Sequence, residues 1–257
     1  MKIAFFSDIH ANLPALEAVL ADIDKHKPDF VYCLGDLVGY NIWPNEVATA
    51  IRQRGIPTLA GNYDEGIGLS SDDCGCAYKS DEEKANGAIS IAYTNKVVHD
   101  NIRAYLRMLP RHMSLEFQNN QEKINLLMVH GSPRKINEYL FEDRPEKSLM
   151  RILEDAQSDI MLFGHTHKPY HRILEYDLNG EKAFRHAINI GSVGKPKDGD
   201  PRACYAIMEL DTSLSLHDAT SVSVQFIRID YDVEKAAKAV EDSELPNAYA
   251  TALRTAQ

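Results

Sequence analysis

The chain has 257 residues, of which 44% are hydrophobic and 26% charged, a composition typical of a globular protein that folds in water. Its formal net charge of −10 argues against a basic surface that grips phosphates, so we expect no generic nucleic-acid binding. No apolar run of about twenty residues and no signal peptide are visible, and only four cysteines occur, so we expect no membrane span and a cytoplasmic location.

The first sixty residues alternate between strand and helix patterns. Short apolar runs predict buried strands at residues 3–6, 30–34 and 56–60. Apolar residues at helical spacing predict helices between residues 13 and 28 and at 44–54. This alternation is typical of parallel strands joined by helical crossovers.

The rest of the chain begins with a polar stretch, for which we predict a helical excursion at about residues 66–122. Further strands are expected at 124–129, 160–163, 171–178, 182–190, 204–210 and 222–229, and a helix at 232–240. Asn179-Gly180 predicts a tight hairpin turn. Neither repeats nor a flexible linker are visible, so we expect a single domain over residues 1–257.

Acidic residues, histidines and one asparagine lie where predicted strands end. They are Asp8, His10, Asp36, Asn62, His130, His165 and His167. Open α/β sheets bind their ligands at the carboxyl ends of strands, so these side chains are expected to meet at one rim.

These residue types suit a pair of divalent cations. Carboxylates and imidazoles bind Mn, Fe, Zn, Ni or Co, and two cations about 3.5–4 Å apart can share a carboxylate and a hydroxide. In an extended segment, Asp8 and His10 point to the same side, as do His165 and His167. Each pair alone is a common coincidence, whereas their ordered combination indicates a dinuclear metal centre.

The same residues carry a family resemblance. Asp8-Ile9-His10, Gly35-Asp36, Gly61-Asn62-Tyr63-Asp64, Val129-His130-Gly131 and Gly164-His165-Thr166-His167 resemble the five signature blocks of calcineurin-like metallophosphoesterases. Ile190 to Gly194 with Asp200-Pro201-Arg202 also resembles the small bacterial and archaeal phosphodiesterase branch.

The resemblance implies a fold and a ligand set. The fold would be a four-layer αββα sandwich, in which two mixed β-sheets are flanked by helices. The first metal would be held by Asp8, His10, Asp36 and His167, and the second by Asp36, Asn62, His130 and His165. Asp36 would therefore bridge two divalent ions, with manganese the foremost candidate and iron, zinc, nickel and cobalt also suitable.

The expected chemistry is hydrolysis of a phosphodiester or phosphoanhydride. A hydroxide bridging the two metals would attack phosphorus, and the metals would neutralise charge on the phosphoryl oxygens. The expected partner is a small phosphorylated substrate, with nucleotides and dinucleoside polyphosphates among the candidates.

One block departs from the family pattern, which usually has histidine where this chain has Tyr63. Asn62, Tyr63 and Asp64 are the predicted catalytic residues of this block. A tyrosine with an ordinary pKa near 10 suits acid catalysis poorly at neutral pH, so we expect a preference for good leaving groups. The alternative is that Tyr63 only packs the site.

Substrate contacts are predicted for Asn12, Tyr63 and His171. For Asn12, capping of the helix that follows is the favoured alternative. His171 could equally be an ordinary histidine on a surface strand.

Two other functions remain open. The chain could be a non-catalytic, metal-bound scaffold on the same fold, as in the retromer subunit that resembles this family. Loss of ligands would favour the scaffold, and none is lost here. A nuclease would need a basic track, which the composition does not supply. The oligomeric state is also open, a homo-oligomer included.

Overall fold

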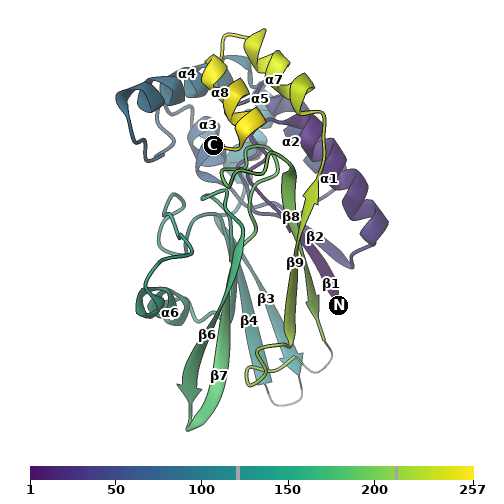
Figure 1. Cartoon of the computed structure of the whole chain (residues 1–257), viewed down its shortest axis with the longest axis vertical. Coiled ribbons are helices and arrows are strands. Elements are labelled where there is room, and N and C mark those ends of the chain that lie inside the picture. Colours follow the sequence, from purple (N-terminus) through teal and green to yellow (C-terminus); the bar gives the residue numbers. More distant parts are fainter. Residues whose placement is uncertain (120–121, 212–213) are drawn as a thin grey trace.

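The computed structural model describes residues 1–119, 122–211 and 214–257, and within them two mixed β-sheets lie face to face (Figure 1). The first sheet has the order β2 (Phe30–Cys33), β1 (Lys2–Phe6), β8 (Ala203–Leu210) and β9 (Val222–Ile229). The second has the order β3 (His112–Asn119), β4 (Glu122–Val129), β5 (Ile160–Phe163), β7 (Glu181–Asn189) and β6 (Tyr170–Leu178).

Helices cover the outer faces of both sheets. On the first sheet lie α1 (Leu13–His26), α2 (Pro44–Gln53), α3 (Asn62–Gly68), α4 (Asp81–Val97), α5 (Asp100–Met108), α7 (Val233–Glu241) and α8 (Asn247–Thr255). The second sheet is covered by α6 (Glu146–Asp155), which packs against β4, β5, β6 and β7 (Figure 1). The predicted four-layer αββα sandwich is therefore confirmed.

Strand β1 shows why its sequence is continuously apolar. Ala4 and Phe6 belong to the core beneath the helices, while Ile3 and Phe5 belong to the core between the sheets. Successive side chains of a strand point to opposite faces, so a strand buried on both faces has no polar position. The same argument applies to the fully buried β5.

Strand direction brings the carboxyl ends of several strands to one rim. β1 and β2 run parallel, with Phe6 beside Cys33. β4, β5 and β7 also run parallel to one another. The segments that follow β1, β2, β4 and β5 therefore leave the two sheets where the predicted metal ligands occur in the sequence.

Two predicted elements need correction. Residues 56–60 are not a strand: Thr58 forms a single bridge to Cys33, and the N–H of Ala60 donates to the carbonyl of Pro110 at 2.8 Å. The helical excursion is also too long as predicted. It is helical through α5, but β3 is a strand whose alternating side chains pack against the core between the sheets.

Other elements follow or extend the prediction. Asn179 and Gly180 have φ values of +57° and +87°, and they join β6 to β7 as a tight turn. Helices α6 and α8 were not predicted. Among the described helices, none is both long enough and apolar enough to cross a bilayer.

Candidate metal centre

The structure brings the predicted ligands together at the rim. Asp8 and His10 follow β1, Asp36 follows β2, and Asn62 opens α3. His130 follows β4, and His165 and His167 follow β5. All seven side chains are buried, with at most 4% of any residue exposed. Burying so many polar groups is unfavourable unless they are bonded to one another or to a cation.

The backbone at this rim is unusual. Asp8, His10, Asp36, His165 and His167 all have positive φ, between +49° and +64°. Residues other than glycine rarely adopt this left-handed conformation, because it brings Cβ close to the carbonyl oxygen. Such strain persists where the surrounding structure enforces it, and it is concentrated at functional sites.

The first group of donors comprises Asp8, His10 and His167. The Nε2 atoms of His10 and His167 lie 3.2 Å apart, and His167 Nε2 lies 3.2 Å from Asp8 Oδ1. His10 Nε2 is 3.8 Å from the same oxygen. Three donor atoms thus converge within the distance over which one cation can bind them all.

The second group comprises Asp36, His130 and His165, with Asn62 beside it. His130 Nε2 lies 3.3 Å from Asp36 Oδ2 and 3.1 Å from Asn62 Oδ1. Asp36 Oδ2 is also 3.6 Å from His10 Nε2, so this oxygen lies between the two groups. The placement suits a carboxylate shared by two ions.

Hydrogen bonds to backbone orient three of the imidazoles. Each Nδ1–H donates to a carbonyl oxygen, which leaves the lone pair of Nε2 directed into the centre. The acceptors are Val38 for His10 (3.0 Å), Leu34 for His130 (2.8 Å) and Lys195 for His167. This is the arrangement by which proteins commonly orient metal-binding histidines.

Two buried atoms test whether cations fit here. Within the described part of the chain, Asp8 Oδ1 and His165 Nε2 have no hydrogen-bond partner. A buried acceptor without a partner is costly, and a divalent cation would satisfy both atoms. The donor set of carboxylate oxygen and imidazole nitrogen also suits Mn, Fe, Co, Ni or Zn.

The charges of the site match this interpretation. Burial lowers the pKa of His10 and of His165 to about 3, so both rings are neutral at pH 7 and can bind a metal. Burial alone would lower the pKa of His130, but Asp36 and Asp8 raise it to about 10. The two carboxylates thus favour positive charge at this position, which a bound cation would supply while leaving His130 Nε2 free to bind it.

Asp64 has a positioning role. Its carboxylate accepts hydrogen bonds from the backbone N–H groups of Asp36 (2.7 Å), Leu37 (2.9 Å) and Gly61 (3.0 Å). With three backbone donors on a fully buried carboxylate, Asp64 fixes the loop of Asp36.

Tyr63 packs under the site. Its ring centroid lies 5.5 Å from that of His10 and 4.7 Å from that of Tyr40. Its hydroxyl is buried without a hydrogen-bond partner among the described residues, and burial raises its pKa well above the usual value. These surroundings favour the packing alternative over acid catalysis.

Asn12 and His171 lie outside the donor set. Asn12 Oδ1 accepts from Ala15 N at 3.2 Å, which caps α1, and Nδ2 donates to Gly194 O at 3.0 Å. Both polar atoms of Asn12 are thus engaged. His171 Nε2 lies 2.9 Å from His186 Nδ1 between β6 and β7, and the structure does not bring it to the ligands.

The glycines before the ligands are required by close packing. A Cβ on Gly61 would lie 2.0 Å from Asp36 Oδ1, and one on Gly164 would lie 2.4 Å from Asp8 Oδ2. Real Cβ atoms do not approach other atoms so closely. The Gly-Asn and Gly-His pairs of the sequence thus reflect a backbone that packs directly against the carboxylates of Asp36 and Asp8.

Sequence reasoning missed Tyr139. Its ring centroid lies 4.1 Å from that of His165, and it stacks on Phe141 at 5.7 Å. Nothing in the local sequence of this loop distinguishes a tyrosine beside a candidate metal ligand from one packed elsewhere.

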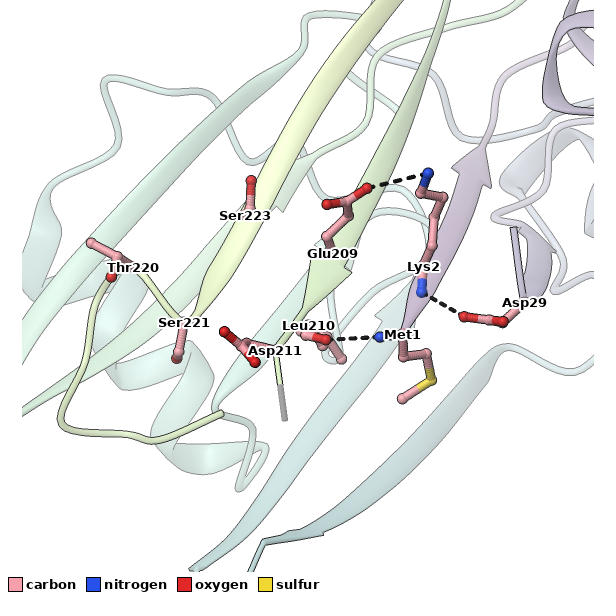
Figure 2. A pocket seen from close by; sticks show the side chains of 9 residues that line it. All are labelled: Met1, Lys2, Asp29, Glu209, Leu210, Asp211, Thr220, Ser221 and Ser223. Atoms are coloured by element: carbon pink, nitrogen blue, oxygen red, sulfur yellow. Dashed lines mark hydrogen bonds and ion pairs between the residues drawn. The ribbon is translucent and has the colours of Figure 1, made fainter. Parts of the chain in front are cut away.

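A separate hollow of about 460 Å³ lies at the amino-terminal end of β1, at the opposite end of this strand from Asp8 (Figure 2). Lys2 Nζ pairs there with Glu209 at 3.3 Å, and the Lys2 N–H donates to Asp29 at 2.7 Å (Figure 2). Its lining includes neither histidine nor cysteine.

Known proteins resemble this chain over nearly its whole length. The chain is 33% identical over 256 residues to an uncharacterised protein of Methanocaldococcus jannaschii, covering 95% of this chain and 93% of that protein. A metallophosphoesterase from Sphaerobacter thermophilus has a similar structure, with a TM-score of 0.73, 28% identity, and coverage of 100% and 99%. A hypothetical protein of Pyrococcus horikoshii shares the fold, with a TM-score of 0.78, 23% identity, and coverage of 100% and 98%.

The family model for the calcineurin-like phosphoesterase superfamily domain matches residues 1–213, a range that contains all seven candidate ligands. The match covers most of the chain and agrees with the fold and with the arrangement of donor groups. The chain therefore belongs to the calcineurin-like phosphoesterase superfamily.

Proposed function

We propose that this protein is a dinuclear metal-dependent hydrolase of phosphodiesters or phosphoanhydrides. The observation that carries the proposal is the pair of buried donor groups on either side of Asp36 Oδ2, which lies 3.6 Å from His10 and 3.3 Å from His130. Two divalent cations held there would acidify water and neutralise charge on phosphoryl oxygens. Manganese is our first candidate for the ions.

The chain's own residues would divide the work as follows. Asp8, His10 and His167 would hold one ion, and Asn62, His130 and His165 the other. Asp36 would bridge the two ions, while Asp64 keeps the Asp36 loop in place through its backbone N–H groups. The carbonyls that accept from the Nδ1 atoms would keep each imidazole aimed at its ion.

The surroundings of Tyr63 support a preference among substrates. A buried tyrosine with a raised pKa is a poor proton donor near neutral pH. We therefore propose that leaving groups needing no protonation are favoured: phosphoanhydrides and aryl diesters over alkyl monoesters.

Metal titration combined with a leaving-group series tests this function. We expect two manganese ions per chain and hydrolysis of a nitrophenyl phosphodiester, with alkyl monoesters slower by about tenfold or more. Metal binding without turnover of any ester would favour the scaffold. Equal rates for alkyl monoesters and aryl diesters would refute the leaving-group preference alone.

A further inference from the structure

A pocket of about 670 Å³ adjoins the metal centre. Tyr40, on one wall, has its ring centroid 4.8 Å from that of His10 in the first donor group. Tyr139, also in the lining, lies 4.1 Å from the ring of His165 in the second group. Two residues of the lining thus pack against ligands from both halves of the centre, and the volume of the pocket suits a ligand of nucleotide size.

The charge of this pocket is opposite to that of the whole chain. The chain has a net charge of −10, yet the charged residues of the lining are four lysines and one glutamate. They are Lys79, Glu83, Lys168, Lys195 and Lys197. The glutamate is engaged at the start of α4, where Glu83 Oε2 accepts from Lys79 N at 2.7 Å.

Lys195 is the unusual member of this set. It is only 8% exposed, and Nζ lies 4.7 Å from the ring centroid of Tyr40 and 5.9 Å from that of Tyr249. Among the described residues, no carboxylate lies within 4 Å of the Nζ of Lys195 or of Lys197. A buried ammonium group without a counter-ion is unfavourable, and a phosphoryl group would supply the missing negative charge.

Backbone contacts fix this pair of lysines beside the metal centre. The carbonyl of Lys195 accepts from Nδ1 of His167, and the N–H of Lys197 donates to the carbonyl of His167 at 3.4 Å. Since His167 belongs to the first donor group, a substrate phosphoryl group at the metal centre would have these two lysines as neighbours.

The remaining wall is aromatic. Tyr78, Tyr139, Phe141 and Tyr249 line the pocket, and the rings of Tyr139 and Phe141 are stacked 13° from parallel. Aromatic side chains bind planar rings by stacking without requiring a particular base. The pocket thus offers positive charge near the metals and flat apolar surface beside it.

On the basis of the proposed function, we propose that Lys195 and Lys197 form a subsite for a second phosphoryl group, adjacent to the one at the metal centre. The substrate class is then a phosphoanhydride, and the aromatic wall receives the base of a nucleoside di- or polyphosphate.

The test is a binding measurement in the presence of a chelator, so that neither metal nor turnover contributes. The probes are the non-hydrolysable α,β-methylene analogue of ADP, AMP with a single phosphoryl group, and inorganic diphosphate. We expect the ADP analogue to bind about tenfold more tightly than AMP, because only the analogue carries the second group. Equal affinities for the analogue and AMP would overturn the subsite.

Variants connect this difference to the two lysines. In Lys195→Met and Lys197→Met, which keep side-chain length and remove the charge, the analogue and AMP should differ by less than about threefold. The matched control is Lys182→Met at the start of β7, an exposed lysine outside the pocket lining, which should keep the full difference. If a folded lysine variant keeps the full tenfold difference in affinity between the analogue and AMP, the assignment is overturned. Lys197→Met provides this test even if Lys195→Met does not fold, because Lys195 is the more buried of the two in the pocket lining.

Two further measurements, the binding of inorganic diphosphate and the hydrolysis of a nitrophenyl diester, test the aromatic wall and distinguish failure of the subsite from failure of the proposed function. Weaker binding of inorganic diphosphate than of the ADP analogue supports the aromatic part, and equal binding overturns it. A protein that binds the analogue through these lysines but hydrolyses no ester would refute the proposed function and leave the subsite intact. Hydrolysis of the nitrophenyl diester without any difference between analogue and AMP would refute the subsite alone.

Discussion

The carboxylate of Asp64 accepts a hydrogen bond from the backbone N–H of Asp36 at 2.7 Å, so one buried acid positions another. Asp64 lies in the first turn of α3, and Asp36 follows β2. The contact ties the helix to the loop from which the proposed bridging ligand projects. Residues that orient a ligand in this way contribute strongly to metal affinity although they do not touch the metal.

Asp64→Asn should therefore weaken metal binding. The amide has a single acceptor oxygen, and its NH₂ group would face backbone N–H donors that now point at a carboxylate. We expect manganese affinity to fall about 10- to 100-fold in a metal titration. Glu65→Gln is the control, because the neighbouring Glu65 pairs with Arg111 and should leave the affinity unchanged. Unchanged affinity in Asp64→Asn would remove the positioning role.

Gly61→Ala should disrupt the centre by steric means. Its Cβ would lie 2.0 Å from Asp36 Oδ1, so the carboxylate or the loop must move. We expect loss of tight manganese binding together with a lowered melting temperature. The control is Gly55→Asn, where φ is +64°, the space is open, and asparagine tolerates the conformation. Normal metal content in Gly61→Ala would show that Asp36 is not held as described.

Tyr63→Phe should preserve activity. The substitution removes only a hydroxyl that has no hydrogen-bond partner among the described residues. We expect turnover of a nitrophenyl phosphodiester within about twofold of the wild type and stability equal or higher by about 1 kcal/mol. Steady-state kinetics and urea unfolding measure these quantities. A large loss of turnover with normal metal content would place the hydroxyl on the substrate.

His186 should make the stability of the metal-free protein depend on pH. Burial lowers its pKa from 6.5 to about 4. Between these pH values the histidine is protonated in the unfolded chain but neutral in the folded protein. The free energy of unfolding therefore decreases as the pH falls from 6.5 toward 4, and this histidine does not affect it above pH 6.5. The effect amounts to up to about 3 kcal/mol.

His186→Gln should consequently flatten the decline in unfolding free energy between pH 6.5 and 4, as followed by urea denaturation at a series of pH values. The other buried histidines titrate in both proteins, so the comparison reports on His186 and on its partner His171, whose Nε2 lies 2.9 Å from His186 Nδ1. Parallel pH profiles for variant and wild type would contradict the burial effect.

The candidate ligands could be predicted from the sequence because the features that mark them lie next to them in the chain. Each ligand follows a short apolar run, and Gly61 and Gly164 mark the places where the backbone must pass close to a carboxylate. The orienting carbonyls of Leu34 and Val38 could not be predicted, because every residue has a carbonyl and only the fold selects the one that accepts.

The errors in the fold have physical reasons. Residues 56–60 look like a strand, but Ala60 bonds to Pro110 and leaves the sheet after one bridge. β3 has the alternation of a strand, with Met113, Leu115 and Phe117 facing the core, yet it lies in a polar context that suggested helix. The pocket wall draws on residues far apart in the chain, such as Tyr139 and Tyr249, and their meeting has no local signal.

The most direct test of the central claim compares the wild type with Asp36→Ala for manganese content and for hydrolysis of a nitrophenyl phosphodiester. The account predicts two ions per chain and turnover in the wild type, and loss of both in a variant that remains folded. Turnover retained by Asp36→Ala would contradict the claim that a carboxylate shared between two metal ions makes this protein a hydrolase.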